Sequence, residues 1–124
     1  MINQILLYLG AALPIFWGIA HLFPTRSVVA GFGEISLDNK RIITMEWIIE
    51  GVALIFIGIV VALAAYIDYT SLTAKAIYWA SFVMLNTLSV ISLFTGLKVS
   101  FLPFKLCPVI FTAFLMLIVL EIYL

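Results

Sequence analysis

Four long apolar runs dominate the sequence, and they constrain the fold more than any other feature. They occupy residues 2–23, 42–67, 76–97 and 104–124. A helix needs about 20 apolar residues to cross a hydrocarbon core about 30 Å thick, and each run meets that length. The strands of a membrane barrel would instead be short segments of alternating polarity, a pattern that this sequence lacks. The sequence therefore predicts an all-α fold with four transmembrane helices.

Composition and the lengths of the connections define this expectation further. Hydrophobic residues make up 66% of the 124 residues and charged residues 10%, whereas a soluble domain carries about 45–50% and about 25%. The length allows one domain over residues 1–124. The connections around residues 68–75 and 98–103 are short, and short connections join antiparallel neighbours. We therefore expect a single-domain, antiparallel four-helix bundle that is embedded in the lipid bilayer as a multi-pass protein.

The charges bear on partners and on orientation. Lys and Arg number 6 and Asp and Glu number 6, so the formal net charge is zero, which argues against nucleic acid as a partner. The basic residues cluster in the first and third connections, with only Lys75 at the opposite end; the clustered residues are Arg26, Lys40, Arg41, Lys98 and Lys105. The positive-inside rule then predicts cytoplasmic first and third connections and places both termini outside.

Two glutamates lie within the apolar run over residues 42–67. Glu46 and Glu50 are four residues apart, so they share one helical face. If the helix enters the membrane near Ile42, Glu50 lies about 12 Å along its axis. An ionised carboxylate there costs about 2.5–3.5 kcal/mol, so it must be protonated, paired or turned toward a polar cavity. We interpret the pair as ligand-binding or proton-handling groups; the alternative is a carboxyl pair that locks helix packing.

The one histidine stands where the first apolar run ends. His21 lies on the same side of the membrane as the two glutamates, four residues after Trp17. It could form an acid–base or ligand-anchoring set with Glu46 or Glu50. The alternative is an interfacial histidine beside a tryptophan of the aromatic belt. Both interpretations stay open at this point.

Other polar and aromatic residues extend the candidate site. Asn86 carries an amide that lipid cannot satisfy, so we expect it to point into the bundle. Phe32 belongs to a segment, residues 27–35, that either lies in the interface or folds over the site as a lid. Arg26 would meet an anionic group or anchor the topology. The candidate ligand-binding residues are Trp17, His21, Arg26, Glu46, Trp47, Glu50 and Asn86, and the catalytic candidates are His21, Glu46 and Glu50.

Metal and cofactor chemistry receive little support from the sequence. A histidine with two carboxylates matches a facial triad by ligand type, but there is one histidine and no HExxH spacing, so we expect no metal site. The single cysteine, Cys107, excludes an intrachain disulfide. No cofactor is firmly implied, and a quinone or a lipid is compatible with the candidate residues.

Two stretches resemble a known family. The stretch Trp17-Gly-Ile-Ala-His21-Leu-Phe-Pro24 ends the first apolar run, and Met45-Glu46-Trp47-Ile-Ile-Glu50-Gly51 opens the second. Together with four short-looped helices in this length, they resemble small DoxX-like integral membrane proteins. The resemblance implies a four-helix bundle. That family includes quinone-linked oxidoreductase subunits and assembly factors, so the resemblance does not choose a reaction.

Four functions therefore stay open. The leading hypothesis is a protein that binds a small hydrophobic or lipid-like ligand in a polar-lined pocket between the helices over residues 2–23 and 42–67. The second is a membrane enzyme, an isomerase or a quinone-linked oxidoreductase, in which His21 and Glu50 transfer protons. The third is an assembly or scaffold subunit that packs against another membrane subunit or a second copy of itself. A proton-coupled transporter, which would need dimerisation, is a fourth option. The sequence does not decide whether the protein is an enzyme.

Overall fold

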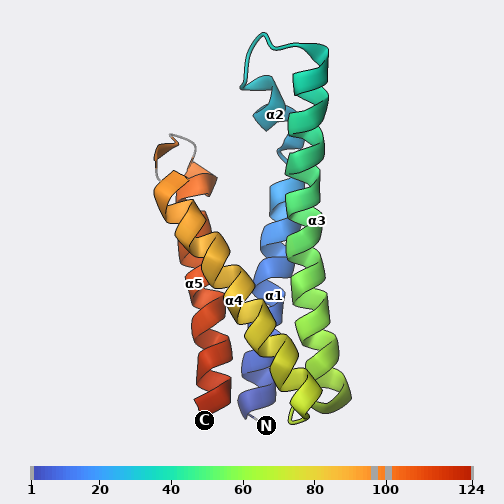
Figure 1. Ribbon diagram of the computed structural model, residues 1–124, viewed down its shortest axis with the longest axis vertical. Helices are drawn as coiled ribbons and strands as arrows, with labels where there is room; N and C mark the ends of the chain where they lie inside the picture. The colour runs from blue at the N-terminus through green and yellow to red at the C-terminus, as the bar shows by residue number, and fades with distance from the viewer. Residues whose placement is uncertain (1, 96–97, 100–101, 124) are drawn as a thin grey trace.

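The computed structural model describes residues 2–95, 98–99 and 102–123, and every regular element in this part is a helix. The elements are, in order, α1 (Ile2–Leu22), α2 (Thr25–Ala30), α3 (Leu37–Asp68), α4 (Leu72–Thr95) and α5 (Leu102–Tyr123). The four long helices alternate in direction, and the two termini lie at the same end of the molecule (Figure 1). The all-α prediction is confirmed.

Three of the long helices, α1, α3 and α4, are long and apolar enough to cross a membrane. At 1.5 Å per residue, the 32 residues of α3 span about 48 Å, well beyond a hydrocarbon core of about 30 Å. The side chains that point away from the bundle include large apolar ones, such as Phe16 (69% exposed), Phe56 (64%) and Val83 (60%). A soluble surface rarely presents so much contiguous apolar area, so these helices are suited to a lipid environment.

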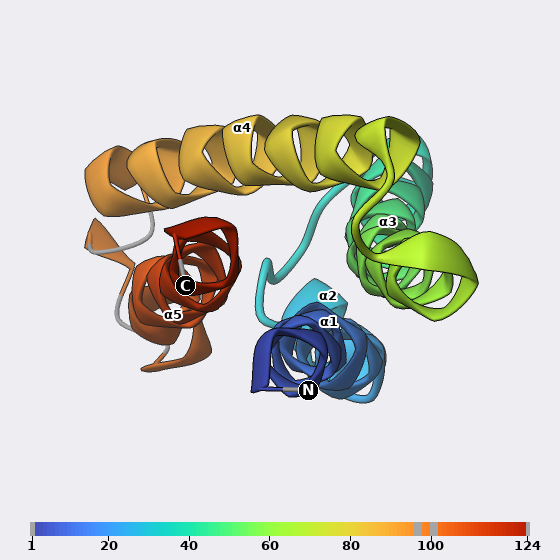
Figure 2. The same ribbon diagram turned by 90° about the horizontal axis from the view of Figure 1, so that it is seen from below.

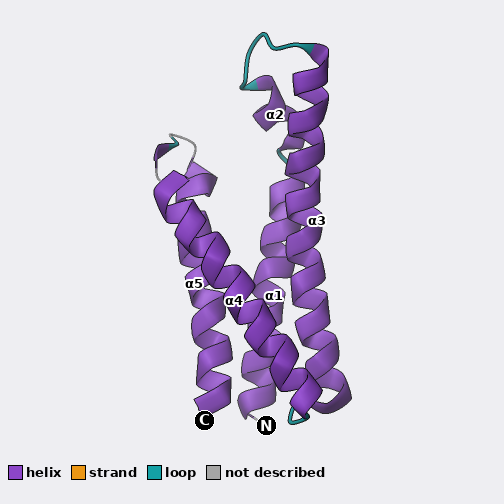
Figure 3. Cartoon of the chain, in the orientation of Figure 1, coloured by secondary structure: helices purple, strands orange, loops and turns teal. Residues whose placement is uncertain are grey.

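The start of α3 differs from the sequence prediction. The helix begins at Leu37, five residues before residue 42, because the Ser36 hydroxyl accepts a hydrogen bond from the Asn39 amide at 3.2 Å and caps the first turn. The short helix α2 occupies much of the remaining connection (Figure 3). The predicted ranges 76–97 and 104–124 include residues 96–97 and 124 at their ends, and these residues lie outside the described part of the chain.

Along α1, α3 and α5, buried residues recur at alternating intervals of four and three. We call each such row a core stripe. The α1 stripe is Leu7, Ala11, Pro14, Gly18 and His21; the α3 stripe is Trp47, Gly51, Leu54, Gly58, Val61 and Ala65; the α5 stripe is Cys107, Phe111, Phe114, Ile118 and Glu121. This spacing is typical of helices that pack side by side in a left-handed bundle.

Glycines bring α1 and α3 unusually close together. A Cβ atom added at Gly18 would lie 2.6 Å from the carbonyl oxygen of Gly51, and one added at Gly58 would lie 2.5 Å from the carbonyl oxygen of Ala11. Small residues permit such backbone approach between membrane helices. Along this stretch, α1 and α3 leave no room for a ligand between them.

The remaining helices complete a ring. Helix α1 packs against α3 and α5, and α4 packs against α3 and α5 on the other side (Figure 2). Helix α4 runs obliquely: its first residues lie beside α3 and its last residues lie on the side of α5. At the end that carries α2, the first turns of α3 therefore stand apart from the α4–α5 pair.

Candidate functional site: an apolar cavity with two carboxylates

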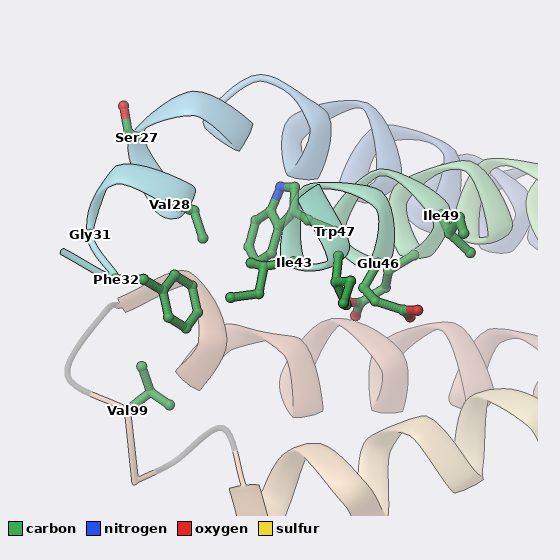
Figure 4. A pocket seen from close by; sticks show the side chains of 11 residues that line it. Ser27, Val28, Gly31, Phe32, Ile43, Glu46, Trp47, Ile49 and Val99 are labelled. Atoms are coloured by element: carbon green, nitrogen blue, oxygen red, sulfur yellow. The ribbon is translucent and has the colours of Figure 1, made fainter. Parts of the chain in front are cut away.

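A cavity of about 990 Å³ lies at the end of the molecule that carries α2. This volume is at the upper end of the range of about 300–1,000 Å³ that is usual for small-molecule sites. The lining comes from α2 and the loop after it, from the first turns of α3 and from the α4–α5 connection (Figure 4). The lining residues are Ser27, Val28, Gly31, Phe32, Ile42, Ile43, Glu46, Trp47, Ile49, Glu50 and Val99. Most are apolar, and the charged ones are the two glutamates.

The end of α1 is fixed by side chains that satisfy its last carbonyl groups. The Trp47 indole N–H donates to the carbonyl oxygen of His21 at 2.7 Å, and the Thr25 hydroxyl donates to that of Leu22 at 2.6 Å. Carbonyl groups in the last turn of a helix lack partners within the helix and need such donors. Trp47 therefore ties the start of α3 to the end of α1 and sets where the next segment begins.

Helix α2 then folds back against α3. Val29 is buried at 6% exposure, and Gly33 takes a positive φ of 73°, which lets the loop turn toward the start of α3. Four residues of this segment line the cavity: Ser27, Val28, Gly31 and Phe32. The segment therefore forms one wall of the cavity.

Three of the predicted site residues form a cluster beside the cavity. The His21 and Trp47 rings stack with centroids 3.8 Å apart and planes at 14°. The His21 Nε2 atom lies 3.6 Å from the nearer carboxylate oxygen of Glu50. This separation is longer than a hydrogen bond, yet it is short enough for a strong electrostatic interaction when the imidazole is protonated. The cluster joins the last turn of α1 to the α3 wall of the cavity.

Glu46 lies one turn before Glu50 and also lines the cavity, so the structure brings both carboxylates to the same concave surface. Arg26 is exposed on α2 and does not contribute to the lining. The cavity therefore holds the acidic candidates without the basic one.

Two further candidates lie away from the cavity. Asn86 was expected to point into the bundle, but it is exposed, because it lies outside the buried face of α4. That face consists of Ala74, Tyr78, Ser81, Leu85 and Ser89. Trp17 is partly buried against the core and lies beside the Cys107 thiol of α5. Neither residue lines the cavity.

The position of the cavity also differs from the predicted pocket. The prediction placed it between the helices over residues 2–23 and 42–67, where the glycine contacts of α1 and α3 now leave no space. The cavity instead lies where α3 meets α2 and the α4–α5 connection. Within the described part of the chain, no group of three His, Cys, Asp or Glu side chains is placed to hold a metal ion.

Several residues of this site were not singled out from the sequence. The apolar wall residues Ile42, Ile43 and Ile49 resemble any membrane-facing residue, but their spacing places them on the face of Glu46 and Glu50, and that signal could have found them. Val99 carries no such signal. Outside this site, Glu121 is 9% exposed at the last position of the α5 stripe, and extending the 4–3 spacing from Cys107 would have predicted its burial.

Comparison with known proteins adds no relative from which a function could be transferred. No protein-family model, curated protein or solved structure matches this chain.

Proposed function

We propose that this chain is an integral membrane protein that binds a small hydrophobic or lipid-like molecule in the cavity beside α2 and α3. One observation carries the proposal: a cavity of about 990 Å³ with mainly apolar walls contains the carboxylates of Glu46 and Glu50. Apolar walls with a few convergent polar groups are the usual composition of a small-molecule site. The stacked His21 and Trp47 support the same wall from the side of α1.

The proposal includes a membrane arrangement. In it α5, with 22 residues, crosses the bilayer together with α1, α3 and α4. The basic residues of the α1–α3 and α4–α5 connections lie at the cavity end, and the positive-inside rule places that end at the cytoplasmic face. The cavity would then open near the inner leaflet, where an amphiphile can enter with its head toward the headgroup region.

Photolabelling tests the binding role. Full-length protein in phosphatidylcholine nanodiscs is irradiated with a diazirine-bearing decanol, and mass spectrometry locates the adducts. We expect adducts on the cavity-lining residues and a several-fold loss of labelling there in Val28→Trp, which fills the cavity. Val83→Trp makes the same change at an exposed position of α4 and should label as the wild type does. Labelling spread evenly over all outward faces, unaffected by Val28→Trp, would contradict the proposal.

The enzyme hypothesis keeps one supporting observation, the approach of His21 Nε2 to Glu50 at 3.6 Å. A proton-transfer role requires both groups to reach the same substrate atom, and Glu50 lines the cavity whereas His21 lies behind it. The enzyme hypothesis would be favoured if a ligand identified by photolabelling is chemically altered after incubation with the wild-type protein. The same ligand should then be recovered unchanged from Glu50→Gln. The DoxX-like resemblance stays a prediction that rests on the two sequence stretches.

A further inference from the structure

The charge of the cavity is one-sided. Both charged residues of the lining are acidic, Glu46 and Glu50. The nearby basic side chains lie outside the lining, and Arg41 faces Asp38 at 3.9 Å instead. A concave apolar surface with low-dielectric walls strengthens the field of the charges that it contains. An occupant therefore meets negative charge wherever these carboxylates are ionised.

His21 does not remove this bias. Its side chain is 7% exposed, and within the described residues its Nε2 atom has no hydrogen-bond partner, although it points to Glu50 at 3.6 Å. Glu50 itself is 47% exposed and lines the cavity, so it lies between a buried imidazole and the cavity. One imidazole can offset at most one of two carboxylates, so a net negative charge remains wherever both carboxylates are ionised.

These features select the head group of the occupant. Resting on the proposed function, we infer that the ligand is a single-chain amphiphile with a positively charged nitrogen, which lies between Glu46 and Glu50. A cation compensates carboxylates that are costly to leave ionised near hydrocarbon, an anion would be repelled, and an uncharged head would leave them uncompensated. Figure 4 places the ring of Phe32 at the end of the cavity beside Val28 and away from Glu46, where it adds to the apolar wall.

The alkyl chain of the amphiphile would contact the apolar wall of the cavity. Ile42, Ile43 and Ile49 of α3 face the cavity together with Val28 of α2 and Val99 of the α4–α5 connection. A two-chain phospholipid with an ammonium head is a poorer occupant, because its phosphate would lie beside the same two carboxylates. The ligand class is therefore an alkylamine or quaternary ammonium compound that lacks an anionic group.

Three probes with the same chain length test the head group. Protein-dependent binding of decyltrimethylammonium, decanol and decanoate is measured by equilibrium dialysis of full-length protein in phosphatidylcholine nanodiscs, with empty discs subtracted. We expect decyltrimethylammonium to bind about tenfold more tightly than decanol, and decanoate to bind more weakly than either. A tenfold difference corresponds to about 1.4 kcal/mol.

Variants assign the preference to the carboxylates. Glu46→Gln with Glu50→Gln should weaken decyltrimethylammonium binding about tenfold and leave decanol binding unchanged, which also shows that the variant is folded. Glu46→Gln alone should produce a smaller loss. Glu34→Gln removes an exposed carboxylate of the α2–α3 loop and should change neither probe.

The outcomes separate the two proposals. Equal binding of the cation and of decanol, or a cation preference that survives the double substitution, would overturn the inference while the proposed function stands. Absence of protein-dependent binding for all three probes would overturn both.

Discussion

The two faces of α3 are built from different residues and serve different purposes. One face carries Gly51 and Gly58 and packs closely on α1: a carbon added at Gly51 would collide with the Leu22 side chain, and one added at Gly58 with the Ala11 carbonyl oxygen. The neighbouring face, in the first turns of the same helix, carries Glu46, Glu50 and isoleucines and faces a cavity. Trp47 belongs to both faces. The first face has no spare volume and the second keeps volume open, so substitutions should be tolerated very differently on the two.

The largest expected effect is on the glycine face. Gly58→Val would place a Cβ atom 2.5 Å from the carbonyl oxygen of Ala11. Because that oxygen belongs to the α1 backbone, it cannot move away without displacing α1. Overpacking of this kind costs about 1–3 kcal/mol or more. We expect a clear drop in the thermal unfolding midpoint in detergent. Ala53→Val adds bulk at an exposed position of α3, and an equal drop in that control would contradict the assignment of the two faces.

The same helix shows which features of the fold and of the site can be predicted from the sequence. Spacing alone indicated that Glu46 and Glu50 share a face, because helical geometry fixes which residues of one helix lie together. Spacing did not indicate which element faces them. In a membrane helix the side that faces lipid is as apolar as the side that packs against other helices. The polarity of its residues therefore does not indicate which side contacts a neighbouring helix. Val99 and Asn86 show the consequence: the first joins the cavity without any local signal, and the second is exposed although its amide suggested the interior.

A smaller effect is expected where the two faces meet. Trp47→Phe keeps an aromatic ring to stack on His21 but removes the N–H that donates to the His21 carbonyl at 2.7 Å. Leaving a buried acceptor without its donor costs about 1–3 kcal/mol. Because Trp47→Phe displaces no backbone, the unfolding midpoint should fall by less than in Gly58→Val. Trp79→Phe, on an exposed part of α4, is the matched control. A Trp47→Phe protein as stable as the wild type would show that the hydrogen bond does not hold α1 to α3.

The smallest effect on stability is expected on the cavity face. Glu46 is exposed to the cavity and has no ion pair within the described residues, so Glu46→Gln removes a charge without removing a packed atom. Surface-like substitutions usually change stability by about 0.5 kcal/mol or less, and removal of an ionised carboxylate near hydrocarbon acts in the stabilising direction. The unfolding midpoint of Glu46→Gln, measured in the same series as Gly58→Val, should therefore equal or exceed the wild-type value. A marked loss of stability would mean that Glu46 holds the helices together. The face that we assign to ligand binding would then be a packing surface, like the glycine face that contacts α1.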